Sequence, residues 1–496
     1  MQKKRFVQTV AGCVVLCFLL WGRIEKTFAA QVRSGPFLAT GIKIGEVTSH
    51  SAIVWTRLTL RPTPNRPDAP MVRFRYSDGT VGGPTRRKRV VAVVYPKGCT
   101  VADIRYAVPG TSGQVRVLYR PEGTSKWLKT DWADVDPDRD FTHQFQLKDL
   151  RPNTRYELQV QTRKTSTSPL GQTMKGRFLT APAADQTAAV VFTVSTGQYF
   201  PDRDRPDGFN IYPAMLKLDP SFFVHTGDIL YYDMLAKTLP LARYHWQRTY
   251  SLPTNVEFHR LVDSYFMKDD HDTWCNDCWP TMKTNQMFQF TFKQGQAVFL
   301  EQVPMGNRTY RTVRWGKDLQ IWLVEGRDFR SPNSMPDGPN KTIWGKTQLK
   351  WLERTVRESD ATFRVLISQT PIVGPDRKNK HDNYANDAFA YEGQRVRQFL
   401  ARQKNMIVVC GDRHWQYMSV DPKTGLREYS CGPASDEHAG GWRDSMFMPE
   451  FHRFLKVAGG FLSVTVQRID GTPTLTVRFH DTKGAVRFSD VIRAEP

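Results

Sequence analysis

Residues 222–231, with the sequence FFVHTGDILY, are the stretch that decides the fold expected of this chain. The stretch opens with a short apolar, partly β-branched run, which is typical of a buried strand. Gly227 ends the strand, Asp228 follows it at once, and Tyr231 comes three residues later. Because sites in open α/β sheets form at the carboxyl ends of strands, we expect the Asp228 carboxylate to project into a crevice.

The same pattern recurs elsewhere in the chain. Residues 406–414 (MIVVCGDRH) place Asp412 and His414 directly after a second apolar run, and weaker forms stand at 190–198 (VVFTVSTGQ) and 321–328 (IWLVEGRD). One such turn is common in proteins and carries no functional meaning by itself. Several in one chain, two of them followed by Tyr or His, predict a metal site assembled from separate strand ends.

Length and charge set the outer bounds. A chain of 496 residues is too long for one core, so we expect two domains. Seventy basic residues against 49 acidic ones give a formal charge of +21, which favours anionic partners or a basic surface adapted to the compartment. The basic residues are dispersed and no helix-turn-helix, zinc-finger or RNA-binding signature is found, so we predict no specific nucleic-acid reader.

Residues 1–30 have the features of an export signal. A positive stretch at 3–5 precedes an apolar run at 6–22, and small residues at 27–30 offer a cleavage site. The run is short for a membrane span, and an uncleaved N-terminal anchor is the alternative. We therefore expect an exported protein, periplasmic or extracellular, with no membrane contact beyond such an anchor.

Five cysteines remain outside the signal, and Cys275 and Cys278 are their only close pair. In an oxidising compartment a local disulfide is the most economical interpretation of this pair. Structural zinc would require a second pair, and a redox motif would require thioredoxin-like surroundings. The sequence alone leaves these alternatives open.

The pattern of strands divides the chain into two domains. Residues 34–181 are predicted to form an immunoglobulin- or fibronectin-like β-sandwich, with strands at 51–56 and 71–76, an insertion at 82–113 and a tyrosine corner within 150–160 (LRPNTRYELQV). Residues 188–496 alternate strand runs with helical patterns at 212–218, 346–358 and 391–403 and close with a hairpin within 461–479, which predicts a layered α/β domain. No catalytic constellation appears in the first domain.

Residues 269–272 (DDHD) form the densest acidic cluster in that domain. Three carboxylates so close repel one another, a strain that a cation would relieve. Flanking aromatic residues argue against full exposure, so we favour a metal site over a solvated loop with a helix N-cap. Asn276 follows within reach of the cluster.

Three further pairs carry candidate chemistry. Asp228 and Tyr231 offer hard oxygen donors, which suit a trivalent or other hard cation better than zinc. Asp412 and His414 stand two residues apart and can both bind a metal, although such a pair is more often a structural turn. Two arginines in 327–330 (RDFR) could clamp a phosphate, or each could form a structural Arg–Asp pair.

These motifs carry a family resemblance. In order, residues 227–231 (GDILY), 269–272 (DDHD), 327–330 (RDFR) and 411–415 (GDRHW) resemble the alkaline phosphatase D (PhoD-like) metallophosphatases. Residues 344–352 (WGKTQLKWL), 368–371 (SQTP) and the N-terminal segments 41–48 and 54–57 also resemble that family. The resemblance covers essentially the whole mature chain. It implies a calcineurin-like catalytic domain that hydrolyses phosphate monoesters or diesters, either small esters or phosphodiester polymers.

The resemblance also implies a dinuclear site with Fe³⁺ and Ca²⁺. In that picture Asp228 bridges the metals and Tyr231 is the phenolate ligand on iron, while the remaining metal ligands are Asp270, Asn276, Asp412 and His414. His271 then contacts the phosphoryl group or protonates the leaving group. Positive charge at Arg327 stabilises the phosphorus centre, and Arg330 and Gln198 bind the substrate.

Two departures from the family matter. Gly197 stands where the family commonly has a cysteine whose thiolate ligates iron, and residues 325–326 (EG) replace a more usual Asp-Thr. Either another residue or water fills the position beside Gly197, or the metal differs, or activity has been lost. Three hypotheses follow in order of preference: an exported phosphatase, a degenerate relative that binds phosphorylated or sulfated polyanions, and an envelope structural protein.

Overall fold

The computed structural model describes residues 35–85 and 87–495. The predicted export signal lies outside these residues. Within the described part of the chain, none of the helices combines the length and the apolar character needed to traverse a bilayer.

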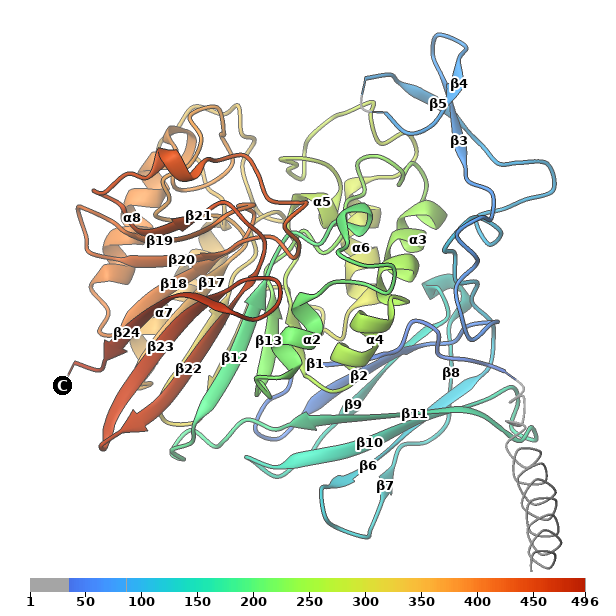
Figure 1. Cartoon of the computed structure of the whole chain (residues 1–496), viewed down its shortest axis with the longest axis horizontal. Helices are drawn as coiled ribbons and strands as arrows, with labels where there is room; N and C mark the ends of the chain where they lie inside the picture. The colour runs from blue at the N-terminus through green and yellow to red at the C-terminus, as the bar shows by residue number, and fades with distance from the viewer. Residues whose placement is uncertain (1–34, 86, 496) are drawn as a thin grey trace, which may run out of the picture.

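Two large β-sheets face each other across the main core of the molecule (Figure 1). The nine-stranded sheet runs in the order β24-β23-β22-β12-β13-β14-β1-β2-β9, and the seven-stranded sheet in the order β15-β16-β17-β18-β20-β19-β21. The strands of the first sheet are β1 (Ile42–Gly45), β2 (Ala52–Arg57), β9 (Thr142–Leu147), β12 (Val190–Ser195), β13 (Phe222–His225), β14 (Ser264–Phe266), β22 (Phe461–Ile469), β23 (Thr472–His480) and β24 (Val486–Arg493). Those of the second are β15 (Arg311–Trp315), β16 (Leu319–Leu323), β17 (Phe363–Ser368), β18 (Met406–Cys410), β19 (Gln416–Val420), β20 (Arg427–Cys431) and β21 (His452–Lys456).

Strand β13 is the predicted central strand, and it is buried on both faces. Phe222 and Val224 point into the core between the sheets, where the Phe222 ring stacks on that of Phe192 with centroids 4.8 Å apart. Phe223 points the other way, into the layer that holds Tyr212 and Phe258. The continuous apolar run is therefore explained by helices and a second sheet that cover opposite faces.

Helices form the outer layers. α7 (Gly345–Glu358) and α8 (Ala390–Ala401) pack on the seven-stranded sheet, while α2 (Ile211–Leu216) and α4 (Pro253–His259) cover the nine-stranded sheet. Beside them α3 (Leu239–Tyr250) and α6 (Phe292–Gln302) build a separate apolar cluster. The predicted helices at 212–218, 346–358 and 391–403 are confirmed, as is the layered α/β class.

The N-terminal region is a β-sandwich that shares a sheet with the α/β domain. β1 pairs in parallel with β14, so β1, β2 and β9 continue the nine-stranded sheet. A five-stranded sheet packs against them, built from β6 (Gln114–Pro121), β7 (Leu128–Lys129), β8 (Ala133–Asp134), β10 (Arg155–Arg163) and β11 (Leu170–Leu179). The predicted tyrosine corner is present, because the backbone N–H of Arg151 donates to the Tyr156 hydroxyl at 2.9 Å.

Two expectations need correction. Residues 71–76 do not join the sandwich: β3 (Arg73–Tyr76) pairs with β4 (Val81–Gly82) and β5 (Val90–Val94) in a separate sheet that packs on Leu241 and Tyr244 of α3. The alternation of apolar and polar residues at 71–76 predicted which side chains are buried, but they are buried against a helix and not within the sandwich.

The predicted disulfide between Cys275 and Cys278 is absent. Both are free thiols in the same apolar cluster as residues of α6, where burial raises the pKa of each.

Candidate metal centre

The strand ends predicted from the sequence meet at one point between the two sheets. Asp228 follows β13 and Asp412 follows β18, each in a left-handed backbone conformation (φ 52° and 61°). The Thr196 hydroxyl connects the two turns, because it donates to the Gly227 carbonyl at 3.1 Å and accepts from the Asp412 N–H at 3.3 Å. A side chain at Gly227 would lie 2.6 Å from the Asp269 Cβ, so only glycine allows this close approach.

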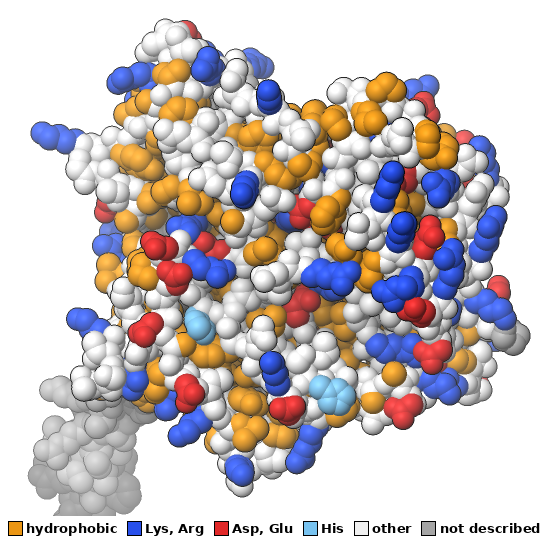
Figure 2. Space-filling view, turned by 180° about the vertical axis from the view of Figure 1, so that it is seen from behind, with side chains coloured by type: hydrophobic (Ala, Val, Ile, Leu, Met, Phe, Trp, Pro, Cys, Tyr) orange, Lys and Arg blue, Asp and Glu red, His pale blue; other side chains and the backbone are white. Residues whose placement is uncertain are grey.

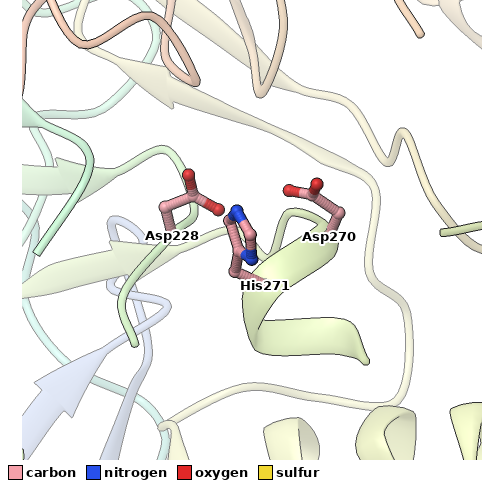
Figure 3. A group of neighbouring side chains, drawn as sticks. All are labelled: Asp228, Asp270 and His271. Carbon is pink, nitrogen blue, oxygen red and sulfur yellow. The ribbon is translucent and has the colours of Figure 1, made fainter. Parts of the chain in front are cut away.

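Four carboxylates converge at this point. One oxygen from each of Asp228, Asp269, Asp270 and Asp412 lies within 4.8 Å of the others, and His271 joins Asp228 and Asp270 at the same range (Figure 3). Buried acceptors without partners are costly unless a cation compensates them. Two carboxylate oxygens, Asp228 Oδ1 and Asp269 Oδ2, have neither a hydrogen-bond partner nor an ion pair among the described residues, whereas Asp412 Oδ2 pairs with the Arg413 guanidinium and Asp270 Oδ1 lies 3.7 Å from Arg327 Nη2. The donor set therefore fits a hard metal cation.

The electrostatics of the cluster agree with this fit. Burial raises the pKa of Asp228 and of Asp269 well above the usual range, and it raises the pKa of Asp412 to about 6. Burial acts in the same direction on Asp270, but Arg327 and other nearby cations outweigh it and lower the pKa of that carboxyl. Without a metal, these carboxylates thus compete with one another for protons, and a bound cation would remove that competition.

The predicted phosphate clamp of Arg327 and Arg330 lies behind the carboxylates instead. Arg327 is fully buried; its Nε donates to Asp269 Oδ1 at 2.5 Å, and its Nη2 lies 3.4 Å from Asp382 Oδ2. Arg330 is buried too and donates to the Asp382 carbonyl at 2.9 Å and to Asn333 Oδ1 at 2.7 Å. Both guanidiniums bind residues that surround the carboxylates, and neither guanidinium is exposed to solvent.

A second group of donors surrounds Tyr231. Its hydroxyl oxygen lies 3.2 Å from Asp228 Oδ2, 3.2 Å from His414 Nε2 and 2.6 Å from His438 Nε2. The other ring nitrogen of His438 lies 2.8 Å from Asp202 Oδ2. The structure thus brings Tyr231, His414 and Asp228 together and adds His438.

His271 is held by a carboxylate that the sequence analysis missed. Its Nδ1 lies 2.5 Å from Asp233 Oδ2, while the ring is directed at Asp228 and Asp270 (Figure 3). Burial tends to lower the pKa of His271, but Asp233, Asp270 and Asp228 outweigh it and raise that pKa well above its usual value. Asp233 stands five residues after Asp228, and that proximity was the available signal.

Two predicted residues lie outside the donor set. Asn276 is exposed, and its backbone N–H donates to Asp233 Oδ1 at 2.9 Å. Gln198 is buried; its side-chain oxygen accepts from the Tyr212 hydroxyl, and its backbone N–H donates to the Asp228 carbonyl at 2.8 Å. Gln198 therefore supports the turn that carries Asp228, and its side chain is enclosed by protein atoms.

A cavity of about 560 Å³ lies beside Asp277, and none of the four carboxylates lines it. Asp277 connects the two, because its backbone N–H donates to Asp270 Oδ2 at 2.6 Å and its side chain lies 2.5 Å from the Lys380 Nζ. This volume is in the range of small-molecule sites. The lining residues are Asn276, Asp277, Trp279, Met282, Asn333, Ser334, Asn379 and His381.

Comparisons with known proteins agree with this architecture. The family model described as "PhoD-like phosphatase" matches residues 192–440, and that of its N-terminal domain matches residues 23–182. The fold is similar to a structure described as that of PhoD (TM-score 0.69, 17% identity, covering 93% of this chain and 91% of that one). It is also similar to the purple acid phosphatase PPD1 from yellow lupin (Lupinus luteus) seeds (TM-score 0.61, 12% identity, 91% and 74%). No curated protein sequence matches the chain. On the family models, the chain belongs to the PhoD-like phosphatase family of phosphoesterases.

Proposed function

We propose that this protein is an exported metal-dependent phosphatase that hydrolyses phosphate monoesters or diesters at a dinuclear centre. The observation that carries the proposal is the convergence of four carboxylates, two of whose oxygens have no partner among the described residues. Membership of the PhoD-like family supports phosphate esters as the substrate class. Export rests on the signal pattern of residues 1–30, and it places the enzyme in the periplasm or outside the cell.

The donors divide into two groups that suit different metals. Asp269, Asp270 and Asp412 provide carboxylates alone, which suits a hard divalent ion such as Ca²⁺. Tyr231 and His414 provide a phenol and an imidazole, which suits Fe³⁺, and Asp228 touches both groups. Metals bound here would polarise the phosphoryl oxygens and lower the pKa of a coordinated water.

The remaining roles belong to the side chains of this chain. His271 carries its proton beside the carboxylates, where it binds a phosphoryl oxygen or hands that proton to the leaving oxygen. Asp233 keeps the ring oriented through Nδ1, and Arg327 holds Asp269 in place from behind. The rest of the ester occupies the cavity lined by residues such as Trp279 and His381.

The surface charge supports small esters over a nucleic-acid polymer read by a basic groove. Figure 2 shows Lys and Arg side chains spread over one face of the molecule with Asp and Glu among them, and they form no single continuous stripe on that face. Exposed basic residues of α7 also pair with acidic neighbours, as Arg354 does with Glu358 at 2.8 Å. Such pairs reduce the local field that a polyanion would meet.

The test combines metal analysis with hydrolysis. Purified mature protein and Asp228→Asn are analysed for bound metals and assayed with a chromogenic phosphomonoester and a chromogenic phosphodiester, before and after chelation. We expect stoichiometric metal and hydrolysis in the wild type and loss of both in Asp228→Asn and after chelation. A metal-free, inactive protein that binds a polyanion with steep salt dependence would overturn the proposal in favour of the binding function.

A further inference from the structure

We propose that His438, oriented by Asp202, is a metal ligand in this chain and takes the place left open by Gly197. The inference rests on the proposed metal centre and names its fourth donor on the Tyr231 side. The ligand set there becomes Asp228, Tyr231, His414 and His438.

Three donor atoms lie close to the Tyr231 hydroxyl oxygen. Around Tyr231 Oη the separations are 2.6 Å to His438 Nε2, 3.2 Å to His414 Nε2 and 3.2 Å to Asp228 Oδ2. His414 Nε2 lies 3.8 Å from Asp228 Oδ2, and the two imidazole rings have centroids 4.3 Å apart. Ligand bonds of about 2.1 Å place neighbouring donors roughly 3 to 3.5 Å apart, so the two 3.2 Å separations already match, and Tyr231 and His438, now in hydrogen-bond contact, would move apart slightly around an ion.

His438 occupies the space toward which a side chain at position 197 would extend. A Cβ built on Gly197 lies 3.5 Å from His438 Cδ2 and 3.2 Å from Pro433 Cβ. The loop that carries His438 is fixed to this turn, because the Ala434 N–H donates to the Gly197 carbonyl at 3.2 Å and Pro433 bridges to Thr196. An imidazole from the adjacent loop thus fills the space beside the turn that itself has no side chain.

Asp202 gives His438 the support typical of a ligating histidine. Its carboxylate lies 2.8 Å from His438 Nδ1, which leaves Nε2 directed at Tyr231. Histidines that bind metals usually donate their other ring N–H to a carboxylate or a carbonyl, which fixes the tautomer. Asp202 is the last residue of the short helix η3 (Phe200–Asp202), which begins three residues after Gly197. The same short segment therefore positions both Gly197 and the Asp202 carboxylate.

Among the described residues, no cysteine belongs to a cluster that could hold a metal ion. Cys431 ends β20, the strand that leads into the loop of His438, yet its Sγ donates to the Cys410 carbonyl at 3.5 Å. Its thiol is therefore directed at β18, away from Tyr231. The inferred set contains only nitrogen and oxygen donors, a phenolate and a carboxylate with two neutral imidazoles, which suits Fe³⁺.

The test measures metal, so it does not depend on activity. Wild type, His438→Ala, His438→Gln, Asp202→Asn and the control His143→Ala, a histidine on β9 in the sandwich, are each reconstituted with Fe³⁺ and Ca²⁺ and desalted. Iron and calcium are then counted, the phenolate-to-iron absorption band is recorded, and circular dichroism checks the fold. We expect at least a tenfold loss of iron affinity in both His438 variants and a 10- to 100-fold loss in Asp202→Asn, with His143→Ala unchanged.

The outcomes separate this inference from the proposed function. A wild type without metal would overturn the metal centre as a whole. A wild type that holds iron, with His438→Ala holding equally much and an unchanged absorption band, would overturn only the role of His438. Full iron binding by folded His438→Gln would likewise overturn it, because glutamine keeps a hydrogen bond to Tyr231 but is a poor ligand for iron.

Discussion

Two histidines lie against Tyr231, and each is held by a carboxylate at Nδ1. Asp233 lies 2.5 Å from His271, and Asp202 lies 2.8 Å from His438. The directions of their pKa shifts are nevertheless opposite. Burial is outweighed by Asp233, Asp270 and Asp228 at His271, so its pKa is raised well above the usual value. At His438 burial dominates over Asp202, and the pKa is lowered.

The comparison shows that burial and the other charges nearby decide whether a histidine paired with a carboxylate keeps its proton. Carboxylates around His271 keep its proton, which suits an acid that meets the phosphoryl group or the leaving oxygen. Burial, aided by the charge of His271, favours a neutral ring at His438, which is the form that binds a metal. In the proposed centre, the same local geometry would therefore supply an acid at His271 and a ligand at His438.

The largest expected effect on stability comes from removing the guanidinium of Arg327, which pairs with Asp269. Arg327→Gln leaves Asp269 buried without its ion-pair partner and removes one of the cations beside Asp382, so we expect a loss of about 3–5 kcal/mol in the free energy of unfolding. Denaturant unfolding in the presence of a chelator measures it, and added Ca²⁺ should restore part of the loss. The matched control is Arg354→Gln, whose exposed pair with Glu358 contributes at most about 1 kcal/mol. Equal losses in the two variants would contradict the buried role of Arg327.

Replacing the acid itself should separate catalysis from metal binding. In His271→Asn we expect kcat to fall by about 10²- to 10⁴-fold while bound metal stays stoichiometric, because the proton donor is lost and the donors around Tyr231 remain. The measurement pairs steady-state hydrolysis with elemental analysis of the same sample. If His271→Asn lost iron as His438→Ala is expected to do, the two histidines would share one role and the comparison would fail.

The sequence predicted those parts of the centre that are local in the chain. Asp228, Tyr231, Asp412 and His414 follow buried strands within a few residues, and parallel strands bring such ends to one edge. Asp270 was found because neighbouring carboxylates are conspicuous. The layered α/β fold and the N-terminal sandwich were predictable for a related reason, since periodicity reports burial and connection lengths report layers.

What the sequence could not predict depends on packing between distant segments. Asp202 and His438 are 236 residues apart, and neither stands in a pattern that reports the other. Arg327 was placed at the correct strand end, but its distance from solvent is set by the 375–382 loop that carries Asp382. Asn276 was within reach by spacing alone, whereas the turn after α5 (Asp270–Thr273) leaves it exposed.

The two supporting carboxylates offer a smaller and more selective test. In Asp233→Asn we expect a 10- to 100-fold fall in kcat with little change in metal content, because the ring of His271 loses its orientation. Asp202→Asn should instead lower the affinity for iron, and its activity should recover when excess iron is supplied. Parallel titrations of activity against added Fe³⁺ distinguish the two variants. Identical titration curves would contradict the division of roles.

A third histidine shows what burial does when no carboxylate is present. His225 on β13 is fully buried; its Nδ1 accepts from the Gly227 N–H at 3.4 Å, and its Nε2 has no partner among the described residues. Burial lowers its pKa from 6.5 to about 3. The folded protein therefore keeps this ring neutral while the unfolded chain protonates it, so stability falls as pH drops below 6.5.

The slope of that loss is about 1.4 kcal/mol for each pH unit between 6.5 and about 3. His225→Gln removes the titrating group, so we expect its stability relative to the wild type to improve by this amount per unit on acidification, whatever the substitution costs at pH 7. Urea unfolding of both proteins at pH 7, 6 and 5, in the presence of a chelator, measures the difference. Parallel stability curves would show that water or movement of β13 relieves the burial. In that case the pKa of His438, which burial also lowers, could not be taken as evidence for a neutral ring.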